Sequence, residues 1–142
     1  MQRPNVGIGI IIQNAHGEIL VGKRKGSHSP FYSIPGGHLE MGETFEEGIK
    51  KEVLEETGLE IENPVVIGVT NNLRTFEASG IHHVSINMFT DNFEGIPKAM
   101  EPDKCEKWFW VNPQELPQPH FDASEFAVEC FLKKQFYITN QS

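Results

Sequence analysis

Positive charge, cysteine and long apolar runs are all scarce in this chain of 142 residues. Lysine and arginine together number 12, against 20 aspartates and glutamates, which gives a formal net charge of −8. This excess of negative charge disfavours nonspecific binding to duplex DNA or to an anionic membrane surface. A small anionic ligand remains compatible with it, because a bound divalent metal reverses the local field.

The two cysteines, Cys105 and Cys130, are too few to form a disulfide framework, which favours a reducing compartment. The apolar run near the N-terminus is too short to cross a bilayer, and no small-residue cleavage site follows it. Repeats and low-complexity tracts are absent as well. We therefore expect one cytoplasmic domain over residues 1–142, with neither a membrane nor duplex nucleic acid as its partner.

Apolar segments alternate with turn residues in a pattern that indicates a mixed α/β domain. The first two strands are expected to pair as a hairpin around Asn14 to Gly17. A polar loop is expected over 91–103, a turn with a short helix over 112–117, and a helix within 121–137. The predicted strands cover residues 6–13, 19–25, 31–34, 65–74, 82–90 and 108–111.

The most informative stretch runs from Gly37 to Leu59 and reads GHLEMGETFEEGIKKEVLEETGL. Thr44 with Glu47 three positions later forms a capping box, and Gly58 suits a left-handed residue after a helix. These signals predict a helix from Phe45 to Thr57.

The carboxylates of this helix are expected to share its apolar face. At about 100° per residue, Glu52, Glu55 and Glu56 fall within the same arc of roughly 100° as Phe45 and Ile49. An ordinary surface helix separates its charges from its apolar stripe. These glutamates also crowd the C-terminal half, where the helix dipole disfavours negative charge and neighbouring carboxylates raise one another's pKa.

Two interpretations of this acidic helix remain open. In the first, the helix is solvated and Lys51 pairs with Glu47 and Glu55. In the second, Glu52 and Glu56, one turn apart, hold or bridge hard divalent cations. Mg²⁺ prefers oxygen ligands and is commonly held by few carboxylates together with substrate phosphates.

Gly37, Glu43 and the run from Lys51 to Leu59 resemble the Nudix box. Lys51 departs from the family, which has arginine there, and keeps the charge without the bidentate fork. Segments 22–27, 35–40 and 101–117 are similar to MutT-like nucleotide triphosphate diphosphatases that hydrolyse oxidised or thiopurine nucleotides. The resemblance implies an α/β/α sandwich around a mixed central sheet, with the box as a loop–helix–loop catalytic motif.

The resemblance also implies the catalytic residues and a cofactor, Mg²⁺ with Mn²⁺ as an alternative. Glu43 would be a supporting carboxylate near Lys51. A loop after the box usually adds an acidic ligand, for which Glu101 is the candidate, with Asp103 behind it. The implied catalytic carboxylates are Glu52, Glu55 and Glu56, and these three together with the Gly37 carbonyl and Glu101 are the implied metal ligands.

Four further residues are candidates for binding substrate: Arg24, Gly36, His38 and Ser85. An arginine fork suits phosphate oxygens, although a basic residue at a strand end is also often merely solvated. Adjacent residues on a strand point to opposite faces, so one of His82 and His83 is expected to face a ligand cleft. No Cys/His spacing supports zinc.

The leading hypothesis is a Mg²⁺-dependent pyrophosphohydrolase that converts (deoxy)nucleoside triphosphates to the monophosphate and pyrophosphate. Alternatives are hydrolysis of ADP-ribose or dinucleoside polyphosphates, which the lack of Pro and Tyr over residues 65–96 disfavours, and a non-catalytic nucleotide-binding Nudix domain. The intact glutamates argue against the last alternative. The base preference, oxidised nucleotides as substrates, the identity of the general base and a homodimeric state stay open.

Overall fold

The structure, a computed structural model, describes residues 2–139. Its strands are β1 (Asn5–Ile12), β2 (Ile19–Arg24), β3 (Tyr32–Ser33), β4 (Gly36–His38), β5 (Glu60–Glu62), β6 (Val65–Asn71), β7 (His83–Thr90), β8 (Asn92–Glu94) and β9 (Cys105–Val111). Its helices are α1 (Phe45–Thr57), α2 (Leu73–Ser79) and α3 (Asp122–Lys133), with a 3-10 turn, η1, at Gly26–His28.

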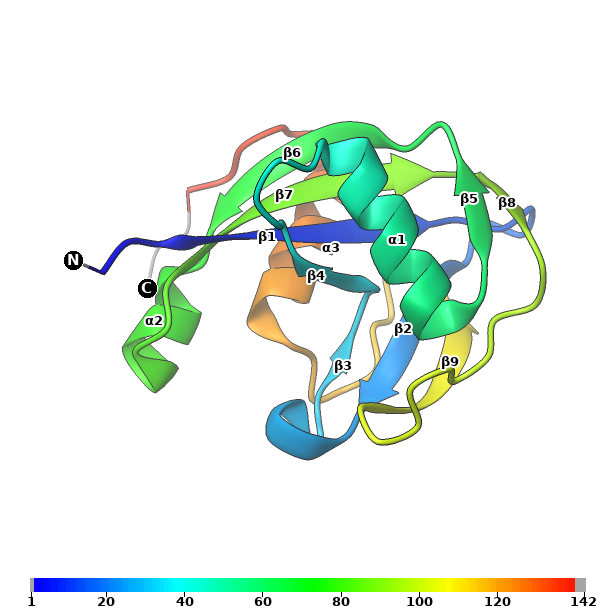
Figure 1. Cartoon of the computed structure of the whole chain (residues 1–142), viewed down its shortest axis with the longest axis horizontal. Coiled ribbons are helices and arrows are strands. Elements are labelled where there is room, and N and C mark those ends of the chain that lie inside the picture. Colours follow the sequence, from blue (N-terminus) through cyan, green and yellow to red (C-terminus); the bar gives the residue numbers. More distant parts are fainter. Residues whose placement is uncertain (1, 140–142) are drawn as a thin grey trace.

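The strands form a mixed sheet and two smaller antiparallel groups (Figure 1). In the four-stranded sheet the order is β4-β1-β7-β6, with β1 parallel to β7 and antiparallel to β4. The second sheet has the order β3-β2-β9, and β5 pairs with β8. Ser85 lies on β7, which is a central strand as expected.

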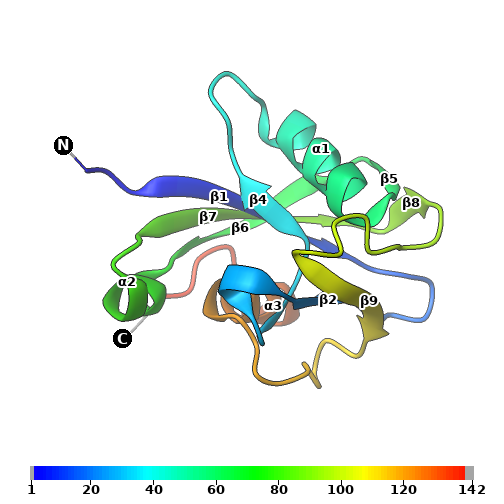
Figure 2. The same cartoon turned by 60° about the horizontal axis from the view of Figure 1, so that its bottom comes forward.

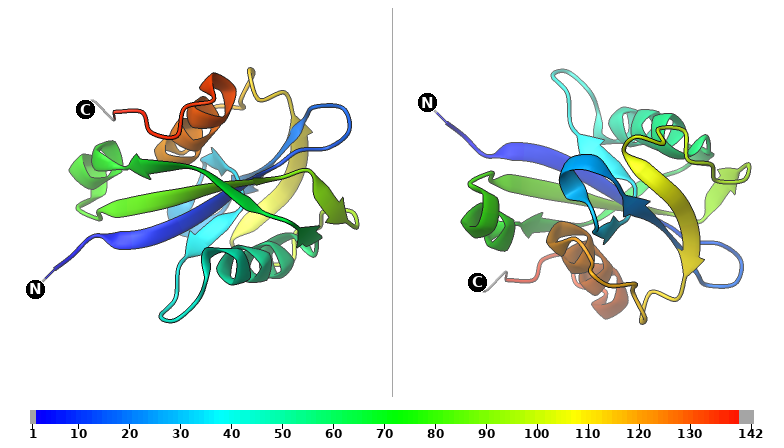
Figure 3. Two further views of the ribbon diagram at one scale, coloured as in Figure 1. Left: turned by 90° about the horizontal axis from the view of Figure 1, so that it is seen from above. Right: turned by 90° about the horizontal axis from the view of Figure 1, so that it is seen from below.

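Two helices enclose this sheet from opposite sides (Figures 2 and 3). Helix α1 contacts β4, β1 and β5, whereas α3 contacts β6 and β1. The short helix α2 lies at the end of the sheet near the N-terminal part of β1 (Figure 1). The architecture is therefore the predicted α/β/α sandwich around a mixed sheet.

Strand β1 separates two apolar cores. Its residues Ile10 and Ile12 pack on the side of α1, with Ile49, and Ile11 packs on the side of α3, with Val128. A continuous apolar run is typical of a strand that is buried on both faces. This explains why the N-terminal segment shows no alternation of polar and apolar residues.

Helix α1 begins and ends where its capping signals predict. The Thr44 hydroxyl accepts from the Glu47 amide at 3.0 Å, and the Glu47 carboxylate accepts from the Thr44 amide at 3.0 Å. Gly58 follows with a φ of 77°, in the left-handed region that glycine adopts readily. These contacts set where the helix begins and ends.

The predicted hairpin between the first two strands is wrong. Strand β1 pairs with β4 and β7, so both of its edges are occupied, and β2 turns away into the other sheet. The predicted turn is present, with the Asn14 amide donating to the Glu18 carbonyl at 2.9 Å, but pairing beyond it is limited, within residues 2–139, to the bridge between Gln13 and Ile19. The strand predicted over 65–74 ends at Asn71, because the chain enters α2 there.

Three smaller differences concern the C-terminal half. The polar loop after Thr90 contains β8, and residues 112–117 form a turn without a helix, in which Asn112 Oδ1 accepts from the Gln114 amide at 2.9 Å. Helix α3 ends at Lys133, followed by a left-handed Lys134 with a φ of 53°.

Both cysteines are free and buried, and residues 2–139 include no helix long and apolar enough to span a membrane.

Candidate active site

Glu56 is the most deeply buried of the predicted catalytic carboxylates, with a side chain that is 13% exposed. Its Oε1 accepts from the Gly36 amide at 3.0 Å, and its Oε2 lies 3.9 Å from an Arg24 guanidinium nitrogen. Burial raises the pKa of Glu56 to about 7, and the charges of Glu52 and Glu101 add to this effect against the opposing Gly36 and Arg24 contacts. The Gly36 and Arg24 contacts therefore do not fully compensate for the burial of the Glu56 carboxylate.

Glu52 lies directly against β4. A Cβ atom added to Gly37 would overlap the carboxyl carbon of Glu52, so only glycine allows the carboxylate this close to the strand. Burial raises the pKa of Glu52, and the neighbouring Glu55 raises it further. Its carboxylate and the strand backbone together offer hard oxygen donors.

Glu55 differs from the prediction, because its side chain is exposed instead of sharing the inward face. The sequence prediction groups residues by their angle about the helix axis alone. Of the three glutamates, Glu52 and Glu56 are the ones that approach the glycine strand, β4 with Gly36 and Gly37. Glu55 still raises the pKa of Glu52 through its charge. It therefore lies at the rim of the acidic cluster.

Lys51 forms ion pairs with two glutamates of the loop that precedes α1. Its Nζ lies 2.6 Å from a Glu43 oxygen and 3.1 Å from a Glu40 oxygen, and the Glu43 carboxylate also accepts from the Glu40 amide at 2.8 Å. Residues 2–139 show no ion pair from Lys51 to Glu47 or Glu55. Lys51 therefore ties the loop before α1 to the helix, with Glu43 beside it as expected.

Glu101 is the loop carboxylate that approaches the acidic cluster. It is half-buried, and its charge raises the pKa of both Glu52 and Glu56. Its backbone carbonyl accepts from the Lys104 and Cys105 amides, which holds the loop before β9. Asp103 is exposed and exerts no comparable influence on either glutamate.

The donor set suits a hard divalent cation. Within residues 2–139, no three His, Cys, Asp or Glu side chains already converge as a complete metal cage. The charge of Glu101 nevertheless acts on both Glu52 and Glu56, which places the three carboxylates near one another. The cations beside them are Arg24, 3.9 Å from Glu56, Lys104, 3.6 Å from Glu101, and Lys51, whose charge lowers the pKa of Glu52. Such a group favours a cation that shares its ligands with a substrate phosphate.

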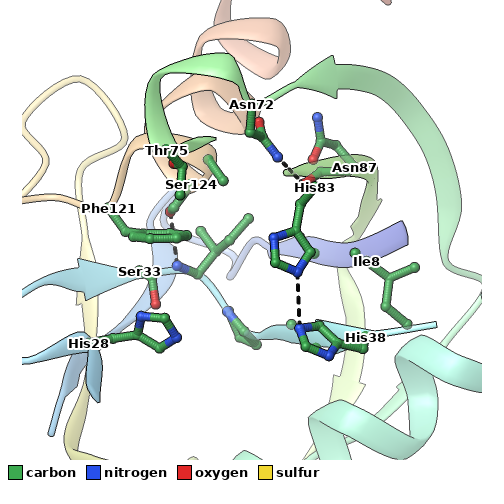
Figure 4. A pocket seen from close by; sticks show the side chains of 18 of the residues that line it. Ile8, His28, Ser33, His38, Asn72, Thr75, His83, Asn87, Phe121 and Ser124 are labelled. Atoms are coloured by element: carbon green, nitrogen blue, oxygen red, sulfur yellow. Dashed lines mark hydrogen bonds between the residues drawn. The ribbon is translucent and has the colours of Figure 1, made fainter. Parts of the chain in front are cut away.

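A pocket of about 240 Å³ opens beside this cluster. Its walls come from β1, β4 and β7, the loop before α2, and the start of α3 (Figure 4). The structure brings all four predicted substrate-binding residues to its lining, together with the predicted ligand Gly37. These four are Arg24, Gly36, His38 and Ser85.

Of the two adjacent histidines at the start of β7, His83 lines the pocket, whereas His82 contacts Asn71 at 2.6 Å. The sequence prediction missed other residues of the pocket. Alternation along β7 from Ser85 would also have indicated Asn87, because side chains two positions apart share a face. Asn72 and Phe121 enter from loops, for which the sequence carries no comparable signal.

Two histidines meet at the pocket's edge. The Nε2 atoms of His38 and His83 lie 3.2 Å apart, and burial lowers the pKa of His83 (Figure 4). Burial also lowers the pKa of His28, with Arg24 contributing. The lowered pKa values of His28 and His83 favour their neutral forms, which leaves Arg24 as the permanently charged group of the pocket lining.

A family model described as the NUDIX domain matches residues 3–130. A MutT NUDIX hydrolase from Burkholderia pseudomallei is similar over 90% of this chain and 98% of that one, with 31% identity and a TM-score of 0.82.

Two more distant structures support the fold alone. A MutT protein from Methanosarcina mazei Go1 has 23% identity and a TM-score of 0.76, covering 94% of this chain and 97% of that one. The NUDIX domain of Shewanella oneidensis NrtR, in complex with ADP ribose, has 11% identity and a TM-score of 0.77, covering 94% and 90%.

The fold, with its glycine strand facing an acidic helix, defines a hydrolase of phosphorus-containing anhydrides that acts on small nucleotide substrates. The chain belongs to the Nudix family and is MutT-like. Members of this family generally use divalent metal ions such as Mg²⁺.

Proposed function

We propose that this protein is a Mg²⁺-dependent pyrophosphohydrolase, working as a single domain, that converts (deoxy)nucleoside triphosphates to the monophosphate and pyrophosphate. The observation that carries the proposal is the acidic cluster of Glu52, Glu56 and Glu101 at the edge of the pocket. Burial raises the pKa of Glu52 and of Glu56 although Lys51 and Arg24 act in the opposite direction, so a further cation beside these carboxylates would be favourable. Mg²⁺ and a triphosphate would complete both the charge and the coordination.

The residues that would hold the metal are Glu52, Glu56 and Glu101, with the Gly37 carbonyl and the rim residue Glu55 assisting. When bound, the metal would neutralise phosphate charge and lower the pKa of a water molecule. A neighbouring glutamate would accept the proton of this water as it attacks phosphorus. Lys51 and Glu43 would act on the position of α1 rather than on the substrate.

Arg24 is suited to the phosphate end of the substrate. Its side chain is 18% exposed, and its Nε has no hydrogen-bond partner among residues 2–139. Its fork reaches Glu56 only at 3.9 Å, so it remains available to phosphate oxygens. This contrasts with a solvated strand end, the alternative that the sequence left open.

The pocket extends from the phosphate end to the loop before α2, which supports a substrate with a nucleoside attached. Gly36 and Gly37 of β4 line the pocket together with Asn72 and Thr75. ADP-ribose is the second candidate, because one structural neighbour is a NUDIX domain in complex with ADP ribose. That domain shares 11% identity with this chain, and the lack of Pro and Tyr over residues 65–96 disfavours ADP-ribose, so the triphosphate remains the first candidate.

A substrate panel tests the proposal. Common and oxidised nucleoside triphosphates would be incubated with Mg²⁺, and phosphate would be measured with and without added inorganic pyrophosphatase. We expect phosphate only when pyrophosphatase is present, since the product is pyrophosphate. ADP-ribose and a dinucleoside polyphosphate would be assayed in parallel by adding alkaline phosphatase, which releases phosphate only from their products. Turnover of these two without turnover of any triphosphate would overturn the proposal.

A further inference from the structure

Asn72 holds an unpaired acceptor in the lining of the pocket. The residue is 1% exposed, and its Nδ2 donates to Ser85 Oγ at 2.7 Å (Figure 4). Its Oδ1 is buried and has no hydrogen-bond partner within residues 2–139. Buried polar atoms in native proteins are almost always paired, so this carbonyl oxygen requires a partner that residues 2–139 do not supply.

The Asn72 side chain does not cap helix α2, although asparagine often caps a helix from this position. Asn72 precedes the first residue of α2, where an asparagine carbonyl commonly accepts from a helix amide. Here the side chain makes no capping hydrogen bond. Nearness to the helix therefore does not account for the residue, and its placement in the pocket does.

Ser85 complements Asn72. The Ser85 oxygen accepts from Asn72, which leaves the hydroxyl proton free to be donated to another group. On the adjacent strand, the Cβ position of Gly7 lies 3.6 Å from Ser85 Oγ, so no side chain of β1 covers the hydroxyl there. An acceptor and a donor thus lie next to each other, a pattern that matches the edge of a nucleobase carrying an N–H beside a ring or carbonyl acceptor.

The surrounding walls suit a flat ring. Phe121 and His28 have ring centroids 5.4 Å apart and lie on one side of the pocket, with His83 and His38 on the other (Figure 4). Figure 4 places Asn72 at the end of the pocket away from His38 and helix α1. A base at Asn72 would therefore lie away from the phosphates at the acidic cluster.

We infer that Asn72 is a specificity-determining residue of a nucleobase subsite, where its Oδ1 accepts an N–H of the base and Ser85 donates to the neighbouring acceptor. The inference rests on the proposed function only in taking the ligand to be a nucleotide. It names the chemistry of the base edge that the pocket selects.

The test compares the best triphosphate substrate with analogues methylated at each base nitrogen that carries a hydrogen. For the wild-type protein, we expect kcat/KM to fall about tenfold or more for the analogue whose methyl group replaces the bonded hydrogen. Asn72→Leu should lower kcat/KM for the parent by a similar factor and bring the ratio of parent to analogue close to one. Asn72→Asp retains an acceptor and should retain the preference.

Thr90→Val is the matched control. Thr90 is also buried, at 2% exposure, and its hydroxyl donates to the Glu62 carbonyl outside the pocket. The control should lower the melting temperature without changing the ratio of parent to analogue. A ratio that is the same in wild type, Asn72→Leu and Thr90→Val would overturn the inference.

Failure of the inference can be told apart from failure of the proposed function. If the wild-type protein hydrolyses no triphosphate, the proposed function fails, and binding decides the inference alone. Calorimetric titration with nucleoside monophosphates and their methylated analogues would then be compared for wild type, Asn72→Leu and Asn72→Asp. Equal affinity for parent and analogue in all three proteins, or no binding to the folded wild type, would overturn it.

Discussion

Glu56 is a largely buried carboxylate whose contacts within the protein do not compensate for its loss of hydration. Its carboxylate is fixed by the Gly36 amide and faces Arg24, yet burial still raises its pKa to about 7. A hydrogen bond and one distant cation are insufficient to offset the loss of water around a carboxylate. The remaining charge is what a divalent cation would neutralise.

Replacing Glu56 with glutamine should lower kcat by at least about a hundredfold, as expected for the loss of a metal ligand. The fold should survive, because the amide preserves the shape of the side chain. Steady-state kinetics with circular dichroism would measure both effects. Glu46→Gln, an exposed change in the first turn of α1, should keep nearly full activity. Near-normal activity of Glu56→Gln would show that the active site lies elsewhere.

The raised pKa of Glu56 predicts that the stability of the protein depends on pH in the presence of a chelator. The pKa of Glu56 is about 7 in the folded protein and 4.5 in a model compound, so the folded state holds the proton more tightly. The free energy of unfolding therefore falls as the pH rises from 4.5 to 7. Above this window, Glu56→Gln should be more stable than wild type by at most about 3 kcal/mol.

Chemical denaturation in EDTA between pH 5 and 8 would measure this difference, which should grow with pH. Adding Mg²⁺ should stabilise the wild type more than the variant, because the metal binds the ionised carboxylate. A difference that is constant over the pH range would contradict a raised pKa at Glu56.

Lys51 is the residue where the box departs from its family. It contacts Glu43 at 2.6 Å and Glu40 at 3.1 Å, both in the loop before α1. Lys51→Arg should therefore keep or increase kcat, since an arginine fork can contact both carboxylates. A large loss of activity in steady-state assays would indicate a role that needs the lysine amine itself.

At the scale of elements, the glycine strand β4 lies between β1 and α1, and its two glycines serve different purposes. A Cβ at Gly36 would overlap the backbone carbonyl of Ile8, which cannot move without disturbing β1. A Cβ at Gly37 would instead overlap the carboxyl group of Glu52, the end of a flexible side chain. One glycine thus serves the sheet and the other serves the active site.

Gly36→Ala should destabilise the protein by about 1–3 kcal/mol or more, as overpacking against a fixed backbone does. Gly37→Ala should melt closer to wild type but lose most of its activity, because Glu52 is displaced. Thermal unfolding and kcat separate the two effects. Gly7→Ala meets only ordinary contacts at 3.6 Å and serves as the stability control. Equal loss of stability in all three variants would contradict this division.

For the whole molecule, the start of α3 is attached to the segment between β3 and β4, directly before Gly36 and Gly37. Ser124 Oγ accepts from the Ile34 amide at 2.9 Å and lies 2.7 Å from His120 Nε2. His120 and Ser124 are both nearly buried, and burial lowers the pKa of His120. This attachment joins two parts of the chain that are 90 residues apart and fixes one wall of the pocket.

Ser124→Ala should reduce the free energy of unfolding by about 1–3 kcal/mol, because the buried Ile34 amide loses its acceptor. Urea denaturation would measure the change. Ser79→Ala removes an exposed hydroxyl that donates to the Thr75 carbonyl, and should stay within about 0.5 kcal/mol of wild type. Similar small effects for both variants would show that the attachment of α3 contributes little.

What the sequence determined by itself is the local part of this protein. The helix Phe45–Thr57 was predictable at both ends, because its caps are set by neighbours within a few residues. The glutamates follow from it, since a regular helix fixes the angle between Glu52 and Glu56. The family also followed from this short segment, because its glycine and carboxylate spacing is read along one stretch of chain.

Tertiary structure alone decided how distant segments meet. The pairing of β1 with β4 and β7 rather than β2, the exposure of Glu55, and the place of Asn72 in the pocket depend on contacts between segments far apart in the chain. A local pattern specifies which face of an element is apolar but not which partner covers it. For this reason the candidate catalytic carboxylates could be named from the sequence, whereas the end of the pocket around Asn72 could not.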